Sequence, residues 1–162
     1  MWLNNKIVKL EKLIRLVHTL KSQKKKIVTT NGVFDILHIG HIRYLRKAKE
    51  LGDCLIVGLN SDSSVKRLKG ESRPINNQND RAEVLSALEF VNYVLIFEDD
   101  TPIKWLSVLK PDIHVKGGDY SLDKIIEKEV VEKNKGRIII LDKVHGVSTT
   151  NIIERLKASE EV

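Results

Sequence analysis

The sequence contains a single cysteine, Cys54, so the chain cannot form an internal disulfide. Disulfides are common in secreted proteins and rare in the cytosol, and this scarcity favours a cytosolic protein with one buried thiol. The longest apolar runs, such as 55–59 and 138–141, are far shorter than the roughly 20 residues of a membrane-spanning helix. Polar residues interrupt the N-terminus, which lacks the apolar core of a signal peptide. We therefore expect a cytoplasmic protein with no membrane partner.

Aromatic residues are also scarce, at 5% of the chain, although the formal net charge is +6. A basic surface can attract either nucleic acid or small phosphorylated ligands. Proteins that bind single strands stack bases on aromatic side chains, and none interleaves with the densest basic run, 21–26. The run is therefore typical of a solvated connector, and we expect no nucleic-acid partner. A non-enzymatic module that binds nucleic acid stays open as an alternative, which would show steeply salt-dependent oligonucleotide binding.

The chain does show a regular alternation of helical and extended patterns, and its 162 residues suffice for one domain with a sizeable core. Helices are expected over 2–21, 40–51, 80–91, 103–109, 123–134 and 150–157. Strands are expected over 27–30, 53–59, 93–97, 113–116 and 137–141. The alternation predicts an α/β fold with a Rossmann-like, doubly wound parallel sheet of five strands. We expect a single domain over 1–162, with a helical extension over 1–25 and a catalytic core over 26–157.

Chemistry-bearing residues follow the first expected strand. Ligands of doubly wound sheets bind beyond the carboxyl ends of the strands, where the strand order reverses. At that point His38 and His41 flank Gly40 at the start of a helix. A helix N-terminus offers free N–H groups and a positive dipole end to phosphate, and both imidazoles can donate to phosphate oxygens. The pattern indicates a phosphate site.

Two motifs carry a resemblance to a known family. Gly32-Val33-Phe34-Asp35 followed by His38-Ile39-Gly40-His41 resembles the signature of the cytidylyltransferase-like nucleotidyltransferases, whose two histidines contact the triphosphate around the reacting α-phosphorus. Gly146-Val147-Ser148-Thr149-Thr150 resembles a second family motif, which implies binding of the β- and γ-phosphates at another helix start. The stretches most similar to heptose 1-phosphate adenylyltransferases are 57–62, 67–70, 73–76, 80–83, 115–120 and 148–153. The resemblance covers about 26–157 and implies a single nucleotidyltransferase domain.

This resemblance implies transfer of AMP from ATP to heptose 1-phosphate, giving pyrophosphate and the ADP-heptose used for lipopolysaccharide core synthesis. A phosphate nucleophile is largely ionised near neutral pH, since its second pKa is about 6, so no strong general base is required. Mg²⁺ is expected, carried mainly by the nucleotide, with no dedicated protein metal site. A separate sugar kinase would supply the sugar 1-phosphate. Three other substrate pairs stay open: glycerol 3-phosphate with CTP, FMN with ATP, and heptose phosphate with another nucleotide.

The resemblance also assigns roles to individual residues. His38 and His41 would donate to the α-phosphate, while Lys69 and Arg81 would supply cations to the phosphates. Arg81 lies near an expected helix start, where the dipole disfavours a cation, and this supports a phosphate contact. The expected nucleotide-binding residues are Asn31, Gly32, Phe34, Asp35, Gly40, Lys66, Lys116, Gly117, Gly118, Asp119, Gly146, Ser148, Thr149 and Thr150.

Three points stay open within this set. Asp35 either orients Asn31 or a histidine, or caps a helix. Lys143 or His145 stands where many wider relatives carry an arginine, and either could supply the positive group. The apolar face of the first helix either packs on the domain or forms a dimer interface, and a homodimer is expected because relatives often self-associate.

Overall fold

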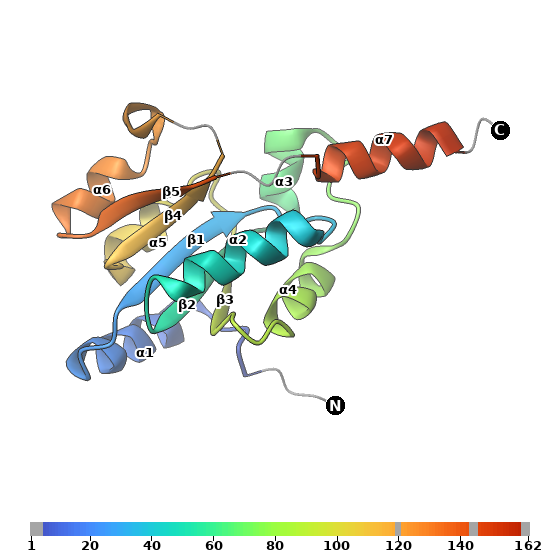
Figure 1. Ribbon diagram of the computed structural model, residues 1–162. Coiled ribbons are helices and arrows are strands. Elements are labelled where there is room, and N and C mark those ends of the chain that lie inside the picture. The colour runs from blue at the N-terminus through green and yellow to red at the C-terminus, as the bar shows by residue number, and fades with distance from the viewer. Residues whose placement is uncertain (1–4, 119–120, 143–145, 160–162) are drawn as a thin grey trace.

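A five-stranded parallel sheet forms the centre of the molecule in the computed structural model, which describes residues 5–118, 121–142 and 146–159 (Figure 1). The strands are β1 (Ile27–Gly32), β2 (Cys54–Asn60), β3 (Tyr93–Phe97), β4 (Ile113–Gly117) and β5 (Arg137–Leu141). Their order is β3-β2-β1-β4-β5, with every neighbouring pair parallel. The expected α/β fold with a doubly wound parallel sheet is confirmed.

Helices cover both faces of the sheet, because each parallel crossover returns the chain over one face. The helical elements are α1 (Leu10–Ser22), α2 (Ile39–Glu50), α3 (Asp62–Lys69), α4 (Gln78–Ser86), α5 (Ile103–Leu109), the 3₁₀ turn η1 (Leu122–Lys124), α6 (Lys128–Lys133) and α7 (Thr149–Ser159). Buried side chains of α2 and α4 pack on one face, and those of α1, α5 and α6 pack on the other. No helix within the described ranges is long and apolar enough to cross a membrane.

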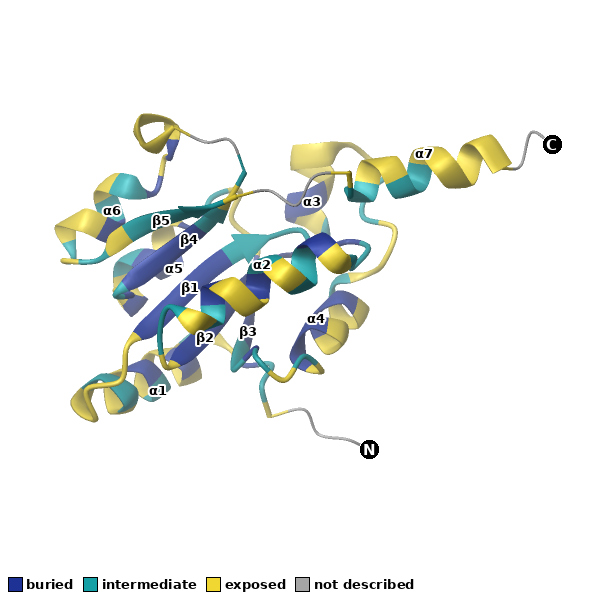
Figure 2. Ribbon diagram, in the orientation of Figure 1, coloured by how far each residue is buried: buried dark blue, intermediate teal, exposed yellow. Residues whose placement is uncertain are grey.

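The central strand β2 shows why the core has two layers. All seven of its residues are buried, and successive side chains point to opposite faces of the sheet (Figure 2). Cys54 and Ile56 therefore join one apolar cluster, while Leu55 and Val57 join the other. Burial raises the pKa of the Cys54 thiol to about 11, so this thiol is neutral and serves as a core residue.

The N-terminal segment differs from the expectation. The helix begins at Leu10 instead of residue 2, because Ile7 forms a parallel bridge with Val94 and the Val8 N–H donates to the Val94 carbonyl. The extended start leaves a shorter helix, whose Leu13 and Val17 are buried in the core. Of the two roles left open for the first helix, the structure shows packing on the domain.

Three other expected elements need correction. The helix α3 was not predicted, because it is polar and buries only Ser64 and Val65, although Ser61 caps it by accepting from the Ser64 N–H. The helix expected over 123–134 is divided into η1 and α6, since Ile125 has extended backbone angles. The helix expected over 80–91 runs over 78–86.

The strand order reverses between β1 and β4. From β1 the chain adds β2 and β3 on one side, and then crosses to place β4 and β5 on the other. Such a reversal leaves a crevice beyond the carboxyl ends of the two strands. The crevice lies beside Gly32, the last residue of β1, and Gly117, the last residue of β4.

Candidate active site

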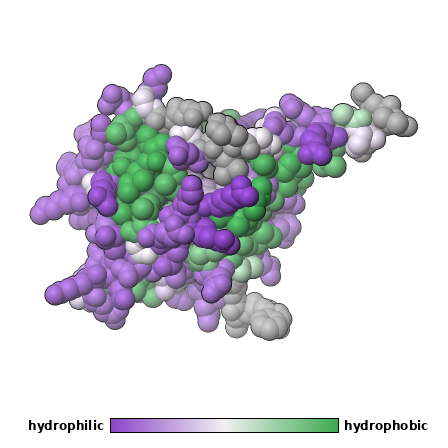
Figure 3. Space-filling view, in the orientation of Figure 1, coloured by the Kyte–Doolittle hydropathy of each residue, from purple (hydrophilic) through white to green (hydrophobic). Residues whose placement is uncertain are grey.

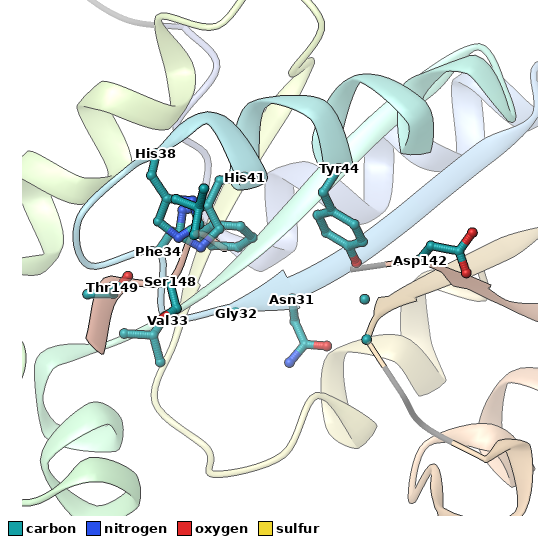
Figure 4. A pocket seen from close by; sticks show the side chains of 14 residues that line it. Asn31, Gly32, Val33, Phe34, His38, His41, Tyr44, Asp142, Ser148 and Thr149 are labelled. Atoms are coloured by element: carbon teal, nitrogen blue, oxygen red, sulfur yellow. The ribbon is translucent and has the colours of Figure 1, made fainter. Parts of the chain in front are cut away.

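A cleft of about 290 Å³ opens at this switch point (Figure 4). His38, His41 and the Phe34 ring gather at one end of it, and Tyr44 and Asp142 lie toward the other. Its walls come from the ends of β1, β4 and β5 and from the starts of α2 and α7. The lining residues are Asn31, Gly32, Val33, Phe34, His38, Gly40, His41, Tyr44, Gly117, Gly118, Asp142, Val147, Ser148 and Thr149.

Two helix N-termini meet at this cleft. His38 is the N-cap of α2 and has an extended backbone, with its imidazole making no capping hydrogen bond. At the start of α7, the Ser148 hydroxyl accepts from the Asn151 N–H at 3.0 Å. The Thr149 hydroxyl donates to the Ile36 carbonyl at 3.4 Å, which joins the start of α7 to the segment before α2. The positive ends of two helix dipoles therefore act on one cavity, an arrangement that favours a polyanion.

The two histidines form a stacked pair. Their ring centroids are 3.7 Å apart with an interplanar angle of 22°, and Phe34 packs edge-on against His41 at 5.2 Å. Both Nδ1 atoms are buried and lack a hydrogen-bond partner in the described part of the chain. An unpaired buried nitrogen is destabilising, and a ligand oxygen or hydroxyl in the cleft would satisfy it.

The electrostatics of the pair keep both rings neutral. Burial, followed by the neighbouring His38, lowers the pKa of His41 to about 4. Burial also lowers the pKa of His38. At neutral pH each ring therefore carries one N–H donor and one acceptor nitrogen. The pair can therefore donate hydrogen bonds to an anion without first binding a proton.

Acid should destabilise the folded protein through His41. Its pKa is about 4 in the folded chain and about 6.5 when unfolded. Between these values the unfolded chain binds a proton that the folded chain does not, so lowering the pH favours unfolding. Between pH 7 and pH 4.5 we expect the melting temperature of the wild type to fall further than that of His41→Gln, with a difference of about 5–10 °C. An equal fall in melting temperature for the two proteins would contradict this expectation, because the carboxyl groups titrate equally in both.

Two glycines keep the cleft open. A Cβ at Gly32 would lie 2.9 Å from Cε2 of Phe34, and one at Gly117 would lie 3.0 Å from Cε2 of Tyr44. Phe34 itself adopts a left-handed backbone with φ of 45°. Side chains at the two strand ends would therefore displace the aromatic rings that shape the cavity.

Tyr44 was missed by the sequence analysis. Its hydroxyl lies 2.6 Å from Oγ1 of Thr30 and donates to the Val115 carbonyl at 3.0 Å, which fixes α2 to β1 and β4. The available signal was its spacing, because a residue three positions after His41 lies on the same helix face. Asp142 was also missed, although it directly follows β5 and so stands at a strand end. Val33 and Val147 complete the unpredicted lining.

Asp35 holds a neighbouring segment instead of facing the cleft. Its carboxylate accepts from Arg73 Nε at 2.7 Å and from the N–H groups of Ile75 and Asn76 at 2.9 Å. Burial alone would raise its pKa, but these hydrogen bonds outweigh it and lower the pKa. Both roles left open for Asp35 are therefore replaced by a third: it anchors the segment 73–76 to the start of the cleft.

Arg81 has a comparable internal role. Its side chain is 0% exposed, and its Nη2 pairs with Asp62 at 2.7 Å. The guanidinium also donates to the carbonyls of Val33, Asn60 and Asn76 at 2.7–2.9 Å. Arg81 does not line the cleft. In place of the expected phosphate contact, Arg81 therefore acts as a brace that joins α4 to the segments containing Val33 and Asn60. Its hydrogen-bond and ion-pair partners offset the unfavourable helix dipole.

Other expected site residues do not line the cleft. Lys66 and Lys69 are exposed in the last turn of α3, with Lys66 3.8 Å from Glu71, and their contact with phosphate stays a prediction. Gly146 and Thr150 are exposed beside the lining residues of the second motif. Lys116 lines a second, separate cleft. The expected roles of Asp119, Lys143 and His145 fall outside the described residues.

Comparisons with known proteins show what the chain as a whole is similar to. The cytidylyltransferase-like family model matches residues 29–155. The bifunctional protein HldE of Geobacter sulfurreducens is 48% identical over 151 residues, which are 93% of this chain and 31% of that protein. The bifunctional protein HldE of Campylobacter concisus is 57% identical over 134 residues, covering 83% of this chain and 28% of that protein. The chain therefore spans about a third of the length of these relatives.

Solved structures give the same fold. A lipopolysaccharide core biosynthesis protein from Thermoplasma volcanium has a TM-score of 0.61 and 33% identity, over 74% of this chain and 97% of that chain. A pantoate-beta-alanine ligase from Francisella tularensis has a TM-score of 0.60 over 95% of this chain and 77% of that chain. At 17% identity the ligase supports the architecture alone.

Proposed function

The chain belongs to the cytidylyltransferase-like family of nucleotidyltransferases, and we propose that it transfers AMP from ATP to a sugar 1-phosphate with release of pyrophosphate. One observation carries the proposal: two helix N-termini and a neutral, stacked histidine pair converge on a single cleft at the switch point. This arrangement suits a triphosphate, which needs several donors at fixed positions more than it needs a single counter-charge.

The chemistry follows from the charges. An oxygen of the acceptor phosphate attacks the α-phosphorus, a new P–O bond forms, and the bond to the β-phosphate oxygen breaks so that pyrophosphate leaves with the electron pair. Because the nucleophile is already anionic, the histidines are not needed as bases. His38 and His41 donate hydrogen bonds to the oxygens where negative charge grows, and the α2 N-terminus adds backbone N–H groups.

Magnesium enters this scheme with the substrate, as the magnesium complex of ATP. Within the described ranges, no group of three or more His, Cys, Asp or Glu side chains is placed to hold a metal ion. We propose that phosphate oxygens and water mainly hold the ion, which is its usual mode in nucleotide sites.

We propose heptose 1-phosphate as the acceptor, giving ADP-heptose for lipopolysaccharide core synthesis. The support is identity near 50% to proteins named bifunctional protein HldE and 33% to a protein named for lipopolysaccharide core biosynthesis. We also propose that a separate sugar kinase makes the acceptor, because the transfer consumes a sugar that already carries a phosphate.

We also propose a cytoplasmic homodimer. The helix α7 projects from the body (Figure 1), and apolar side chains gather over its start (Figure 3). Leu156 on this helix is 60% exposed, and a second copy of the chain could cover it. Cell fractionation would test the location, and a monomer mass in light scattering would rule out the dimer.

The proposed reaction is tested by pyrophosphate release from ATP, Mg²⁺ and heptose 1-phosphate. We expect release that depends on the sugar phosphate, because water is a poor acceptor in a site built for an anionic nucleophile. CTP with glycerol 3-phosphate, ATP with FMN, and heptose phosphate with other nucleotides form the comparison panel. Faster turnover with any of these would reject the proposed substrates and keep the transfer chemistry.

A further inference from the structure

A second cleft, of about 270 Å³, adjoins the nucleotide cleft on the side of α5 and α6. The two cavities share one lining residue, Asn31, at the end of β1. The second cleft combines two lysines, two carboxylates and an apolar edge. It is lined by Asn31, Asp100, Pro102, Lys116, Lys124, Ile125, Ile126 and Glu127.

A buried chain of polar contacts holds the wall between the two clefts. The Lys116 ammonium lies 3.3 Å from Oδ1 of Asn31 and 2.5 Å from Oε1 of Glu127. The same carboxylate oxygen is 3.4 Å from Nε2 of His114, whose Nδ1 lies 2.8 Å from the Thr29 hydroxyl. The Glu127 side chain is 2% exposed, whereas that of Lys116 is 18% exposed. Glu127 is therefore held by a buried residue of the sheet, His114, and in turn it holds the Lys116 ammonium at the opening of the second cleft.

Glu127 is a charged group at the base of this cleft. Burial alone would raise its pKa, but the neighbouring His114 imidazole and Lys116 ammonium outweigh burial and lower the pKa to about 2. The carboxylate is therefore ionised at neutral pH, and the interaction keeps Lys116 beside it. An ionised carboxylate accepts hydrogen bonds from hydroxyl groups.

The geometry of transfer limits where an acceptor can bind. The attacking oxygen must lie about 3–3.5 Å from the α-phosphorus, so the acceptor must bind beside the triphosphate cleft. The second cleft lies beside it, since the two cavities share the lining residue Asn31. Its lining suits a phosphorylated sugar: the carboxylates of Glu127 and Asp100, the latter also paired with Arg67 at 2.8 Å, can accept from hydroxyl groups, and Lys116 and Lys124 supply cations for a phosphate.

We propose that the second cleft is the acceptor subsite and binds the polyhydroxylated body of a sugar phosphate. Lys116, at the junction with Asn31, contacts the acceptor phosphate, and Glu127 and Asp100 accept from sugar hydroxyls. Lys124 adds a second cation at the rim. The assignment rests on the proposed function, because it takes the reaction to be transfer to a phosphorylated sugar.

The test compares two lysines four residues apart, Lys124→Ala and the matched control Lys128→Ala. Lys124 lines the cleft, whereas Lys128 lies outside it and pairs with Asp123 at 3.4 Å. In steady-state pyrophosphate release, Lys124→Ala should raise the KM for heptose 1-phosphate about 10-fold, as expected for one lost charged hydrogen bond. Its KM for ATP and its kcat should stay within about twofold, and Lys128→Ala should match the wild type.

A second variant, Glu127→Gln, keeps the shape of the side chain and removes its charge. It should also raise the KM for heptose 1-phosphate more than that for ATP, and its melting temperature reports any loss of folding. A rise in the ATP KM alone, or identical constants for Lys124→Ala and Lys128→Ala, would overturn the subsite while wild-type turnover upheld the proposed function. Absence of turnover by the wild type with every phosphorylated acceptor would reject the function, and the subsite with it.

Discussion

Replacement of His41 by alanine is expected to lower kcat/KM for pyrophosphate release by about 1,000-fold. The imidazole is neutral, partly buried and stacked on His38 at the start of α2, so its N–H is fixed before the nucleotide binds. A preorganised donor aimed at developing charge contributes about 100- to 1,000-fold to a rate, since it requires no reorganisation in the transition state. Loss of the ring also leaves a gap beside Phe34, which packs against His41. The loss of kcat/KM should therefore lie at the upper end of this range.

The control is His18→Ala, which removes an exposed histidine from α1, far in sequence from the cleft. It should keep the wild-type kcat/KM. His41→Asn retains an N–H donor and should recover part of the lost activity. Unchanged turnover in His41→Ala, with its melting temperature close to that of the wild type, would show that the α2 backbone alone stabilises the departing charge.

The sheet could be predicted because its strands carry strong local signals. Six of the seven residues of β2 are apolar or glycine, a composition that fits a strand buried on both faces. The start of α1 could not be predicted in the same way, because Ile7 continues the helical spacing of the apolar residues. Its actual partner, Val94, lies in a distant strand. The short helix α3 has only two apolar residues, Val65 and Leu68, which are too few to identify a helix from their spacing.

The candidate site was predicted where backbone geometry determines it. His38, Gly40 and Ser148 line the cleft because strand ends and helix starts meet at a switch point, and both features can be read locally. The errors concern side chains whose partners are distant in sequence. Asp35 faces Arg73 and the segment after it, and no spacing rule links the two positions.

Glu127 illustrates the same limit. It was predicted to lie inside a continuous helix, but its carboxylate turns inward toward His114 and Lys116. A buried carboxylate needs such partners, since an unpaired charge in the interior is strongly destabilising. These partners stand on β4, so the buried cluster becomes visible only when the strands are assembled.

Arg81→Met is expected to reduce the free energy of unfolding by about 3–5 kcal/mol, a large part of the stability of a domain of this size. The substitution keeps an apolar stem but removes the guanidinium, which leaves Asp62 without its 2.7 Å partner. The carbonyls of Val33, Asn60 and Asn76 would lose their donors as well. Arg81→Lys should be nearly as damaging, because an ammonium cannot reproduce the planar fork of donors.

The matched control is Arg67→Met, which breaks the exposed pair with Asp100 and should change the free energy of unfolding by less than about 1 kcal/mol. Urea unfolding measures stability, and kcat/KM is measured at a temperature where each variant is folded. A brace predicts a large loss of stability with a smaller loss of kcat/KM, transmitted through Val33 at the cleft wall. A stable Arg81→Met protein with greatly reduced kcat/KM would instead restore the phosphate contact. The two roles differ in the quantity that they change. A brace contributes to the free energy of unfolding, whereas a phosphate contact contributes to kcat/KM, because it forms only after ATP is bound.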